Sequence, residues 1–222
     1  MLQRNVRTTN RNKKSHYIVA LFVFVCVALS ACSGKQGHVE VIDLTDSTEW
    51  RDGDIALRCG WGMESRAVTA NGRSAYSHVG LIHYDSINRI WEIIHAVPGE
   101  DDPEYLKAEP LSVFYHKERA KCGAWLRVDC SDSIARKAVQ YAQRKVNEHI
   151  LFDNDYLLED TTRLYCTELI WHSFLISGID ASGGNRHSVP QFICAEGECI
   201  FPSDLEKSKT TLYVKPFKFK LL

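Results

Sequence analysis

Two residues far apart in the sequence have the types and the settings that nucleophilic catalysis requires. Cys166 stands where a polar loop runs into an apolar helix, and His78 lies in an apolar strand. A thiol at a helix start is acidified, because the unpaired backbone N–H groups there favour a negative charge. An imidazole on a neighbouring strand completes a thiolate–imidazolium pair. The two residues predict a cysteine hydrolase, with rapid alkylation of Cys166 near neutral pH as its signature.

The periodicity of apolar residues predicts the elements that position this pair. Strands are expected at 55–58, 77–84, 89–97, 124–128, 189–200 and 211–219, and helices at 65–70, 111–116, 131–150 and 166–177. Ser131 can cap the third helix, and Gly178 can end the helix that Cys166 begins. Residues 98–110 have the composition of an acidic loop, either solvated or a lid over the site. The pattern predicts an α+β fold with helices packed on an antiparallel sheet.

The first 31 residues predict export to the cell envelope. Five basic residues precede an unbroken apolar run at 17–29, which has the length of a signal segment and is short for a membrane span. The following Leu29-Ser30-Ala31-Cys32 resembles the lipobox of bacterial lipoproteins, whose cysteine is lipidated after cleavage; an ordinary secretory signal is the alternative. We therefore expect a removed signal peptide at 1–31, a lipidated Cys32 with a tether at 32–50, and one domain at 51–222. The lipid would anchor the protein in a bacterial membrane, the outer one where there are two.

The composition of the remaining chain limits its partners and its redox chemistry. Removal of 31 residues from 222 leaves 191, the size of one domain, with a formal charge of about −6, which argues against nucleic acid as a partner. Outside the cytoplasm we expect disulfides among Cys59, Cys122, Cys130, Cys194 and Cys199. The pairs considered are Cys122 with Cys130 and Cys194 with Cys199. Neither has the close spacing of a zinc knuckle, so we expect no metal site and no cofactor.

Five short motifs occur in an order that resembles the circularly permuted branch of the papain-like NlpC amidases. They are Gly53-Asp54-Ile55, Ser77-His78-Val79-Gly80, Ile93-Ile94-His95-Ala96, Tyr165-Cys166-Thr167-Glu168-Leu169 and Pro202-Ser203-Asp204-Leu205. The resemblance spans roughly residues 51–215, and histidine before cysteine is the mark of the permutation. It implies a sheet or partial barrel packed on helices, with Cys166 as nucleophile at the start of a central helix. It also implies His78 as general base, His95 as the polar group that orients His78, and the backbone N–H of Cys166 as an oxyanion donor.

The register of one hairpin decides between two candidates for the orienting residue. If a four-residue loop follows Tyr84, this residue pairs with Arg89, and His78 lies opposite His95 on one face of the sheet. Glu92 is the rival, because a register shifted by an odd number of residues turns every side chain of the strand to the other face. The four-residue loop favours His95.

Two functions are compatible with these observations. The first is a cofactor-independent cysteine amidase or peptidase of the cell envelope, acting on peptidoglycan stem peptides or on N-acyl or lipid-linked amides. The second is a catalytically silent lipoprotein that binds a peptide or lipid fragment in the same cleft. Taken alone, Cys166 and His78 are compatible with structural roles in a core. Their joint occurrence in the motifs favours the hydrolase.

Overall fold

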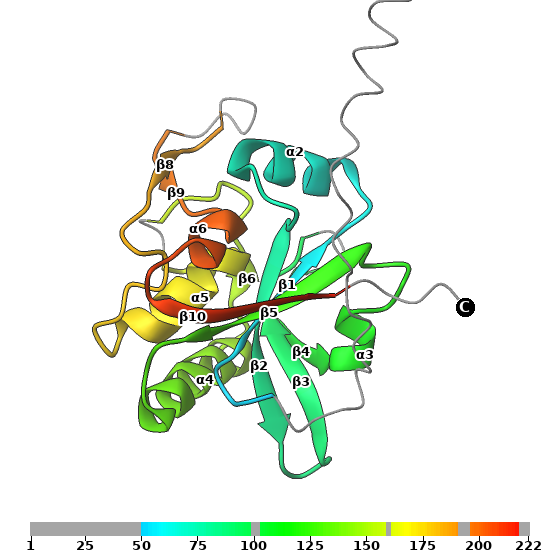
Figure 1. Cartoon of the computed structure of the whole chain (residues 1–222), viewed down its shortest axis with the longest axis vertical. Coiled ribbons are helices and arrows are strands. Elements are labelled where there is room, and N and C mark those ends of the chain that lie inside the picture. The colour runs from blue at the N-terminus through cyan, green and yellow to red at the C-terminus, as the bar shows by residue number, and fades with distance from the viewer. Residues whose placement is uncertain (1–49, 99–102, 159–160, 191–195, 218–222) are drawn as a thin grey trace, which may run out of the picture. The chain divides into compact units, whose positions relative to one another are not determined.

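A six-stranded antiparallel sheet forms the centre of the domain (Figure 1). The computed structural model describes residues 50–98, 103–158, 161–190 and 196–217, all within the unit Glu40–Leu222. The signal segment, Cys32, the tether up to residue 49 and Cys194 lie outside the described residues. The strand order is β10-β5-β1-β2-β3-β4, and every neighbouring pair is antiparallel. The α+β prediction with an antiparallel sheet is confirmed.

Short strands and helices make up the described part of the chain. The strands of the main sheet are β1 (Ile55–Cys59), β2 (His78–Asp85), β3 (Ile90–His95), β4 (Lys107–Pro110), β5 (Cys122–Val128) and β10 (Thr211–Phe217). The helices are α2 (Met63–Gly72), α3 (Leu111–Phe114), α4 (Asp132–Asn147), α5 (Cys166–Leu175) and α6 (Pro202–Glu206). Two small sheets pair β6 (Leu151–Phe152) with β7 (Arg163–Leu164) and β8 (His187–Ser188) with β9 (Glu198–Cys199).

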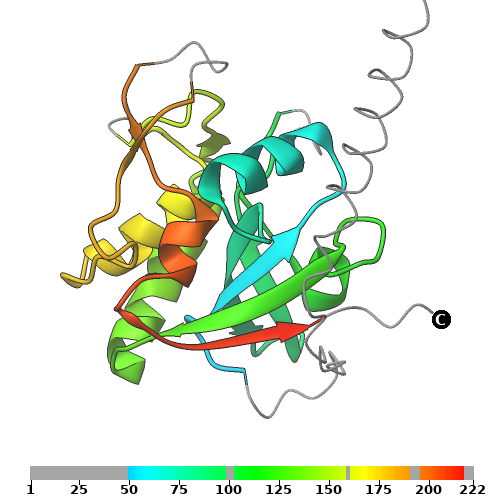
Figure 2. The ribbon, with the colours of Figure 1, turned by 45° about the horizontal axis from the view of Figure 1, so that its top comes forward.

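Each face of the main sheet carries its own core. On one face Leu81 and Ile94 are fully buried and belong to the cluster that includes Leu169 of α5. On the other face Ile82 belongs to a smaller cluster with Phe114 of α3. Figures 1 and 2 show α4 and α5 together on one side of the sheet, with α3 beside β3 and β4. Burial on both faces explains why strands β2 and β3 are nearly continuous apolar runs.

The predicted cap at the start of α4 and the predicted stop after α5 are both present, although α4 and α5 end three and two residues before the predicted positions 150 and 177. The Ser131 side chain caps α4 by accepting a hydrogen bond from the backbone N–H of Ile134. Beyond α5 the chain turns at Gly178, which has a φ of +79°, and the N–H of Gly178 bonds to the carbonyl of Leu175. No helix among the described residues combines the length and the hydropathy of a membrane span.

The β2–β3 hairpin closes one residue later than predicted, so the predicted Tyr84–Arg89 pair is wrong. Asp85 pairs with Ile90, and the whole register moves by two residues. The physical reason is the Asp85 carboxylate, which accepts the backbone N–H groups of Ile87 and Asn88 and so holds Asp85 at the end of the strand. Arg89 then adopts the left-handed conformation, with a φ of +59°. Because the shift is even, every side chain keeps its predicted face.

One further strand prediction and one loop prediction are wrong. The long strand expected at 189–200 is wrong, because its described part contains only the short β9, which pairs with β8. The acidic segment 98–110, expected as a loop, contributes β4 at the edge of the main sheet. The sequence Lys107-Ala108-Glu109-Pro110 lacks the apolar alternation that identifies a strand.

The pairing of Cys122 with Cys130, one of the two disulfides considered from the sequence, is contradicted by the structure. Cys122 begins β5 and Cys130 follows its far end, so the two residues are separated by roughly 25 Å of extended chain. A disulfide requires Cα atoms within about 7 Å. Cys122 lies opposite Cys59 of β1 instead, and all five described cysteines are thiols. The pair Cys194–Cys199 lies partly outside the described residues.

Candidate active site

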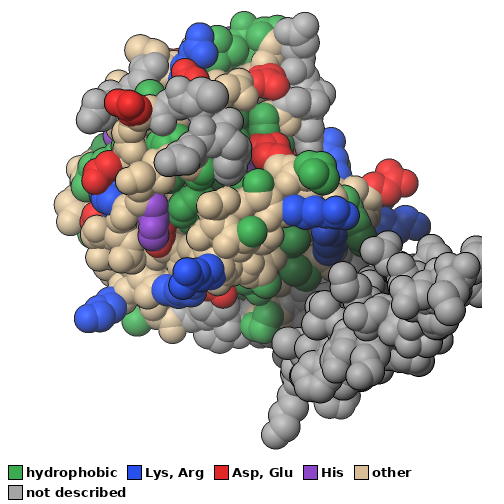
Figure 3. All heavy atoms as spheres, turned by 90° about the horizontal axis from the view of Figure 1, so that it is seen from above, with side chains coloured by type: hydrophobic (Ala, Val, Ile, Leu, Met, Phe, Trp, Pro, Cys, Tyr) green, Lys and Arg blue, Asp and Glu red, His purple; other side chains and the backbone are tan. Residues whose placement is uncertain are grey.

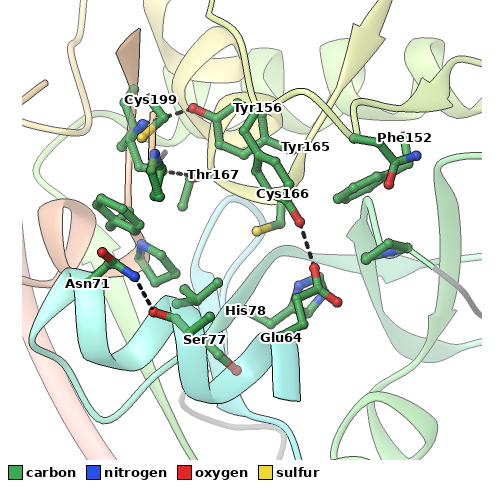
Figure 4. A pocket seen from close by; sticks show the side chains of 18 of the residues that line it. Glu64, Asn71, Ser77, His78, Phe152, Tyr156, Tyr165, Cys166, Thr167 and Cys199 are labelled. Carbon is green, nitrogen blue, oxygen red and sulfur yellow. Dashed lines mark hydrogen bonds between the residues drawn. The ribbon is translucent and has the colours of Figure 1, made fainter. Parts of the chain in front are cut away.

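The three residues predicted to act together meet at one end of the sheet. Cys166 is the first residue of α5, His78 the first of β2 and His95 the last of β3. Cys166 and His78 line one pocket of about 490 Å³, and Figure 4 shows both side chains in it. Nε2 of His78 lies 2.8 Å from Nδ1 of His95. This contact leaves Nδ1 of His78 as the ring nitrogen that remains for the thiol.

The environment of the Cys166 thiol opposes ionisation. Burial raises its pKa to about 11, and the negative charge of Glu64 acts in the same direction. Backbone N–H groups of Val79, Thr167 and Cys166 itself favour the thiolate but do not outweigh burial. The direction is opposite to the lowered pKa expected from the helix start alone. Desolvation removes more stabilisation from the thiolate than the helix N-terminus returns.

The two imidazoles are also held in their neutral forms. Burial lowers the pKa of His78 well below its ordinary value, and the positive charge of Arg58 adds to the effect. Burial likewise lowers the pKa of His95, although the Glu109 carboxylate opposes the shift. The resting site therefore favours a neutral thiol beside a neutral imidazole. The thiolate–imidazolium pair expected from the sequence is disfavoured before substrate binds.

A buried carboxylate that the sequence did not identify stands behind His95. Glu109 of β4 is 7% exposed, and its Oε1 lies 3.2 Å from Nε2 of His95. The contact is close but poorly directed for a hydrogen bond. Nη1 of Arg119 lies 2.8 Å from the second carboxylate oxygen, and Nη1 of Arg58 lies 4.0 Å from the first. His78, His95 and Glu109 thus form a row of contacts that leads from the pocket, which Cys166 also lines, into the protein.

Phe114 of α3 fixes the two imidazoles from the side. Its ring centroid lies 5.7 Å from that of His78 and 5.2 Å from that of His95, with an edge-on arrangement to His95. The Arg58 guanidinium lies 4.5 Å from the same ring and donates a hydrogen bond to the Phe114 carbonyl. Aromatic and cation–π packing on a fully buried ring restricts the side-chain torsions of both histidines.

The hairpin register brings His95 to the site and keeps Glu92 away. Glu92 pairs with His83, in the alternate set of positions that faces the other side of the sheet. Gly80 replaces His78 as the residue beside His95: a Cβ on Gly80 would stand 3.0 Å from the His95 Cβ and 2.2 Å from Ile93 Cγ2. His78 therefore reaches His95 diagonally across the space that Gly80 leaves open.

The pocket in front of Cys166 is mostly apolar. Its lining includes Met63, Val68, Phe152, Ile200, Phe201 and Pro202. Helix α2, which has no buried residue, forms one wall, and Tyr156 donates a hydrogen bond of 2.6 Å to Glu64 from the opposite wall (Figure 4). Figure 3 views the molecule from this side, where hydrophobic side chains reach the surface among charges of both signs. A second hollow of about 320 Å³, lined by Arg58 and Arg119, shares His78 with the first.

Sequence reasoning missed three residues around the two histidines, and only one of them lies in an element that was not predicted. Glu109 lies in the unpredicted strand β4, and Arg58 ends a strand that was expected. Phe114 lies in a short helix that was expected but given no role. The only sequence signal for Glu109 was its position directly before Pro110, where a strand can end at a sheet edge.

Comparisons with known proteins identify a structural neighbour. No family model matches the chain, and no curated protein does. The chain is similar in structure to the metalloprotein YiiX from Escherichia coli O157:H7 (DUF1105), with a TM-score of 0.60 and 17% identity. The match covers 78% of this chain and 98% of that one. Among the described residues here, no group of three or more His, Cys, Asp or Glu side chains forms a metal site. At 17% identity, the likeness to YiiX is one of fold alone.

Proposed function

We propose that this protein is a cysteine amidase that cleaves N-acyl or lipid-linked amides in the bacterial cell envelope, in a permuted papain-like fold. The observation that carries the proposal is the shared pocket of Cys166 and His78, with Nε2 of His78 2.8 Å from Nδ1 of His95. A nucleophile, a base and a group that orients the base are the parts that a covalent hydrolase requires.

The neutral resting pair determines the order of proton transfers in the proposed reaction. His78 takes the thiol proton as the Cys166 sulfur attacks the amide carbonyl, because the thiolate is not populated beforehand. Backbone N–H groups of Cys166 and Val79, both directed towards the sulfur, stabilise the oxyanion. The protonated His78 gives its proton to the leaving amine, which leaves a thioester on Cys166. Water activated by His78 then hydrolyses the thioester and frees the acid.

The lining of the pocket favours an acyl chain over a peptide as the group beside the nucleophile. A stem peptide presents several amide and carboxyl groups that need partners, whereas an alkyl chain gains free energy from apolar walls. The pocket volume of about 490 Å³ lies in the range typical of small-molecule sites. The expected lipid anchor on Cys32 would bring the site close to membrane-associated acyl amides.

Hydrolysis of N-acyl amino acids by variants of residues that line the pocket tests the proposal. We expect Cys166→Ala and His78→Ala to abolish release of fatty acid from a panel of N-acyl amino acids, followed by mass spectrometry. Cys199→Ala is the matched control, because Cys199 lines the same pocket without touching the described row of histidines. Turnover that survives in Cys166→Ala would contradict the proposal. Cleavage of cell-wall peptides but not of acyl amides would keep the hydrolase and change its substrate class to peptidoglycan peptides. Ligand retention without turnover in the wild-type protein would favour the silent binding protein.

A further inference from the structure

We propose that Glu109 is a positioning residue that sets the tautomers of both imidazoles and thereby leaves Nδ1 of His78 free to accept the thiol proton. The assignment of a base rests on the proposed function, whereas the tautomers themselves do not. Three contacts carry the inference: Glu109 with Arg119, Glu109 with His95, and His95 with His78.

Glu109 is a fixed negative charge at the inner end of the row. It pairs with Ile93 across β3 and β4, which places its side chain on the face of the sheet that also carries His95. Both carboxylate oxygens lie near Nη1 of Arg119, at 3.2 and 2.8 Å. Burial alone would raise the carboxyl pKa, but His95 and Arg119 outweigh it and lower the pKa to about 2. Glu109 is therefore ionised near neutral pH.

The ionised carboxylate determines which nitrogen of His95 carries a proton. Nε2 lies 3.2 Å from Glu109 Oε1, and a lone pair on this nitrogen would face the lone pairs of the oxygen. No better-directed hydrogen-bond partner for this nitrogen occurs among the described residues. The proton of His95 therefore resides on Nε2. Since the buried ring holds only one proton, Nδ1 keeps its lone pair.

The same reasoning passes from His95 to His78. The lone pair on Nδ1 of His95 lies 2.8 Å from Nε2 of His78, so Nε2 of His78 must donate. Burial and the positive charges of Arg58 and Lys107 hold His78 in its singly protonated form. Nδ1 of His78 is left as the unprotonated nitrogen. A charge on β4 thus fixes the state of a base on β2, with one imidazole between them.

Loss of the charge would release both tautomers together. With a neutral partner on Nε2, His95 can carry its proton on Nδ1, and His78 must then reverse as well. A His78 ring protonated on Nδ1 cannot accept the thiol proton. For Glu109→Gln we expect a fall of about 10-fold to 100-fold in kcat with little change in KM, as for other residues that orient a reactive group.

Nitrogen-15 NMR of the full chain, labelled at histidine, tests the inference. In the wild-type protein we expect protonated Nε2 and unprotonated Nδ1 for both His78 and His95, and mixed tautomers in Glu109→Gln. Glu109→Asp, which keeps the charge, should restore the wild-type pattern. Glu148→Gln removes an exposed carboxylate at the end of α4 and should leave the spectrum unchanged.

The wild-type spectrum decides the matter even where the variant does not fold. Protonated Nδ1 on either histidine would overturn the role of Glu109, and so would unchanged tautomers in a folded Glu109→Gln. The predicted tautomers together with no hydrolysis of any amide would support the role of Glu109 and reject the proposed function. Hydrolysis of an amide together with protonated Nδ1 on His95 would keep the proposed hydrolase and reject the role of Glu109.

Discussion

The two sides of the His78 ring differ in how they are built. Towards the pocket, the ring shares an open, mostly apolar space with Cys166, and burial opposes charge on the thiol. Towards the interior, the same ring contacts His95, and His95 in turn lies beside the Glu109 carboxylate, which is paired with Arg119. In the proposed reaction, the chemistry takes place on the open side, towards the pocket, and His78 is oriented from the closed side, towards the interior. Because the two sides are separate, a ligand in the pocket would leave the contacts that orient His78 in place.

The closed side can be broken most directly at His95. Replacement by Leu removes the acceptor for Nε2 of His78, and we expect kcat to fall about 100-fold. Replacement by Asn, which carries an oxygen near the position of Nδ1, should restore part of the rate. Steady-state kinetics of the two variants measure the difference. Equal losses of kcat in His95→Leu and His95→Asn would show that the rate does not depend on a hydrogen-bond acceptor at position 95.

The close approach of His95 to β2 predicts an effect on stability as well. A methyl group at position 80 would stand 2.2 Å from Ile93 Cγ2 and 3.0 Å from the His95 Cβ. We expect Gly80→Ala to lower the free energy of unfolding by about 1–3 kcal/mol, as measured by denaturant titration. Gly62→Ala is the control, since a Cβ at Gly62 meets no atom within 4 Å. A neutral Gly80→Ala would mean that the β2–β3 register differs from the one described.

The open side predicts a thiol that reacts slowly in the absence of substrate. A pKa of about 11 against an ordinary value of 9.0 leaves about 100-fold less thiolate at pH 8. Alkylation of Cys166 by iodoacetamide, followed by peptide mapping, should accelerate as the pH rises towards 11. The same shift makes the free energy of unfolding depend on pH, because the unfolded chain loses the thiol proton at a lower pH than the folded protein does. The stabilisation from this thiol is complete below pH 9 and is lost as the pH rises to about 11. Rapid labelling of Cys166 at pH 7 would contradict the raised pKa and support the thiolate–imidazolium pair that the sequence predicted.

The smallest effect is expected at the rejected candidate. Glu92 is paired with His83 and faces away from the histidine row. Glu92→Gln should change kcat by less than about twofold, within the range of surface substitutions. A loss comparable to that of His95→Leu would reverse the assignment of the orienting residue.

The sequence predicted those parts of the fold in which local chemistry and burial agree. The buried runs of β2 and β3 and the Ser131 cap of α4 all combine apolar periodicity with a clear start signal. Strand β4 was missed because its residues are held by pairing with β3 and by ion pairs, not by an apolar face. The hairpin register was missed because the Asp85 side chain, which is compatible with either a loop or a strand end, decides it through hydrogen bonds.

The candidate site was predicted as residues but not as an electrostatic environment. Cys166, His78 and His95 follow from motifs, and the position of His78 and His95 on one face of the sheet follows from the even shift of the β2–β3 register. The neutral state of the pair depends on burial by α2, Phe114 and the segment around Tyr156, which come from distant parts of the chain. The contribution of Glu109 depends on Arg119, ten residues further along the chain. Burial and ion pairs between distant segments arise only after folding, so the spacing of residues in the sequence does not reveal them.

Isolation of an acyl-enzyme tests the central claim most directly. The wild-type protein is mixed with an activated medium-chain acyl ester, quenched in acid within the first turnover and mapped by peptide mass spectrometry. We predict one acyl group in thioester linkage on Cys166, absent when His78→Ala is treated in the same way. Acylation of Cys199 instead, or equal acylation of Cys166 in His78→Ala, would contradict a cysteine nucleophile served by this histidine.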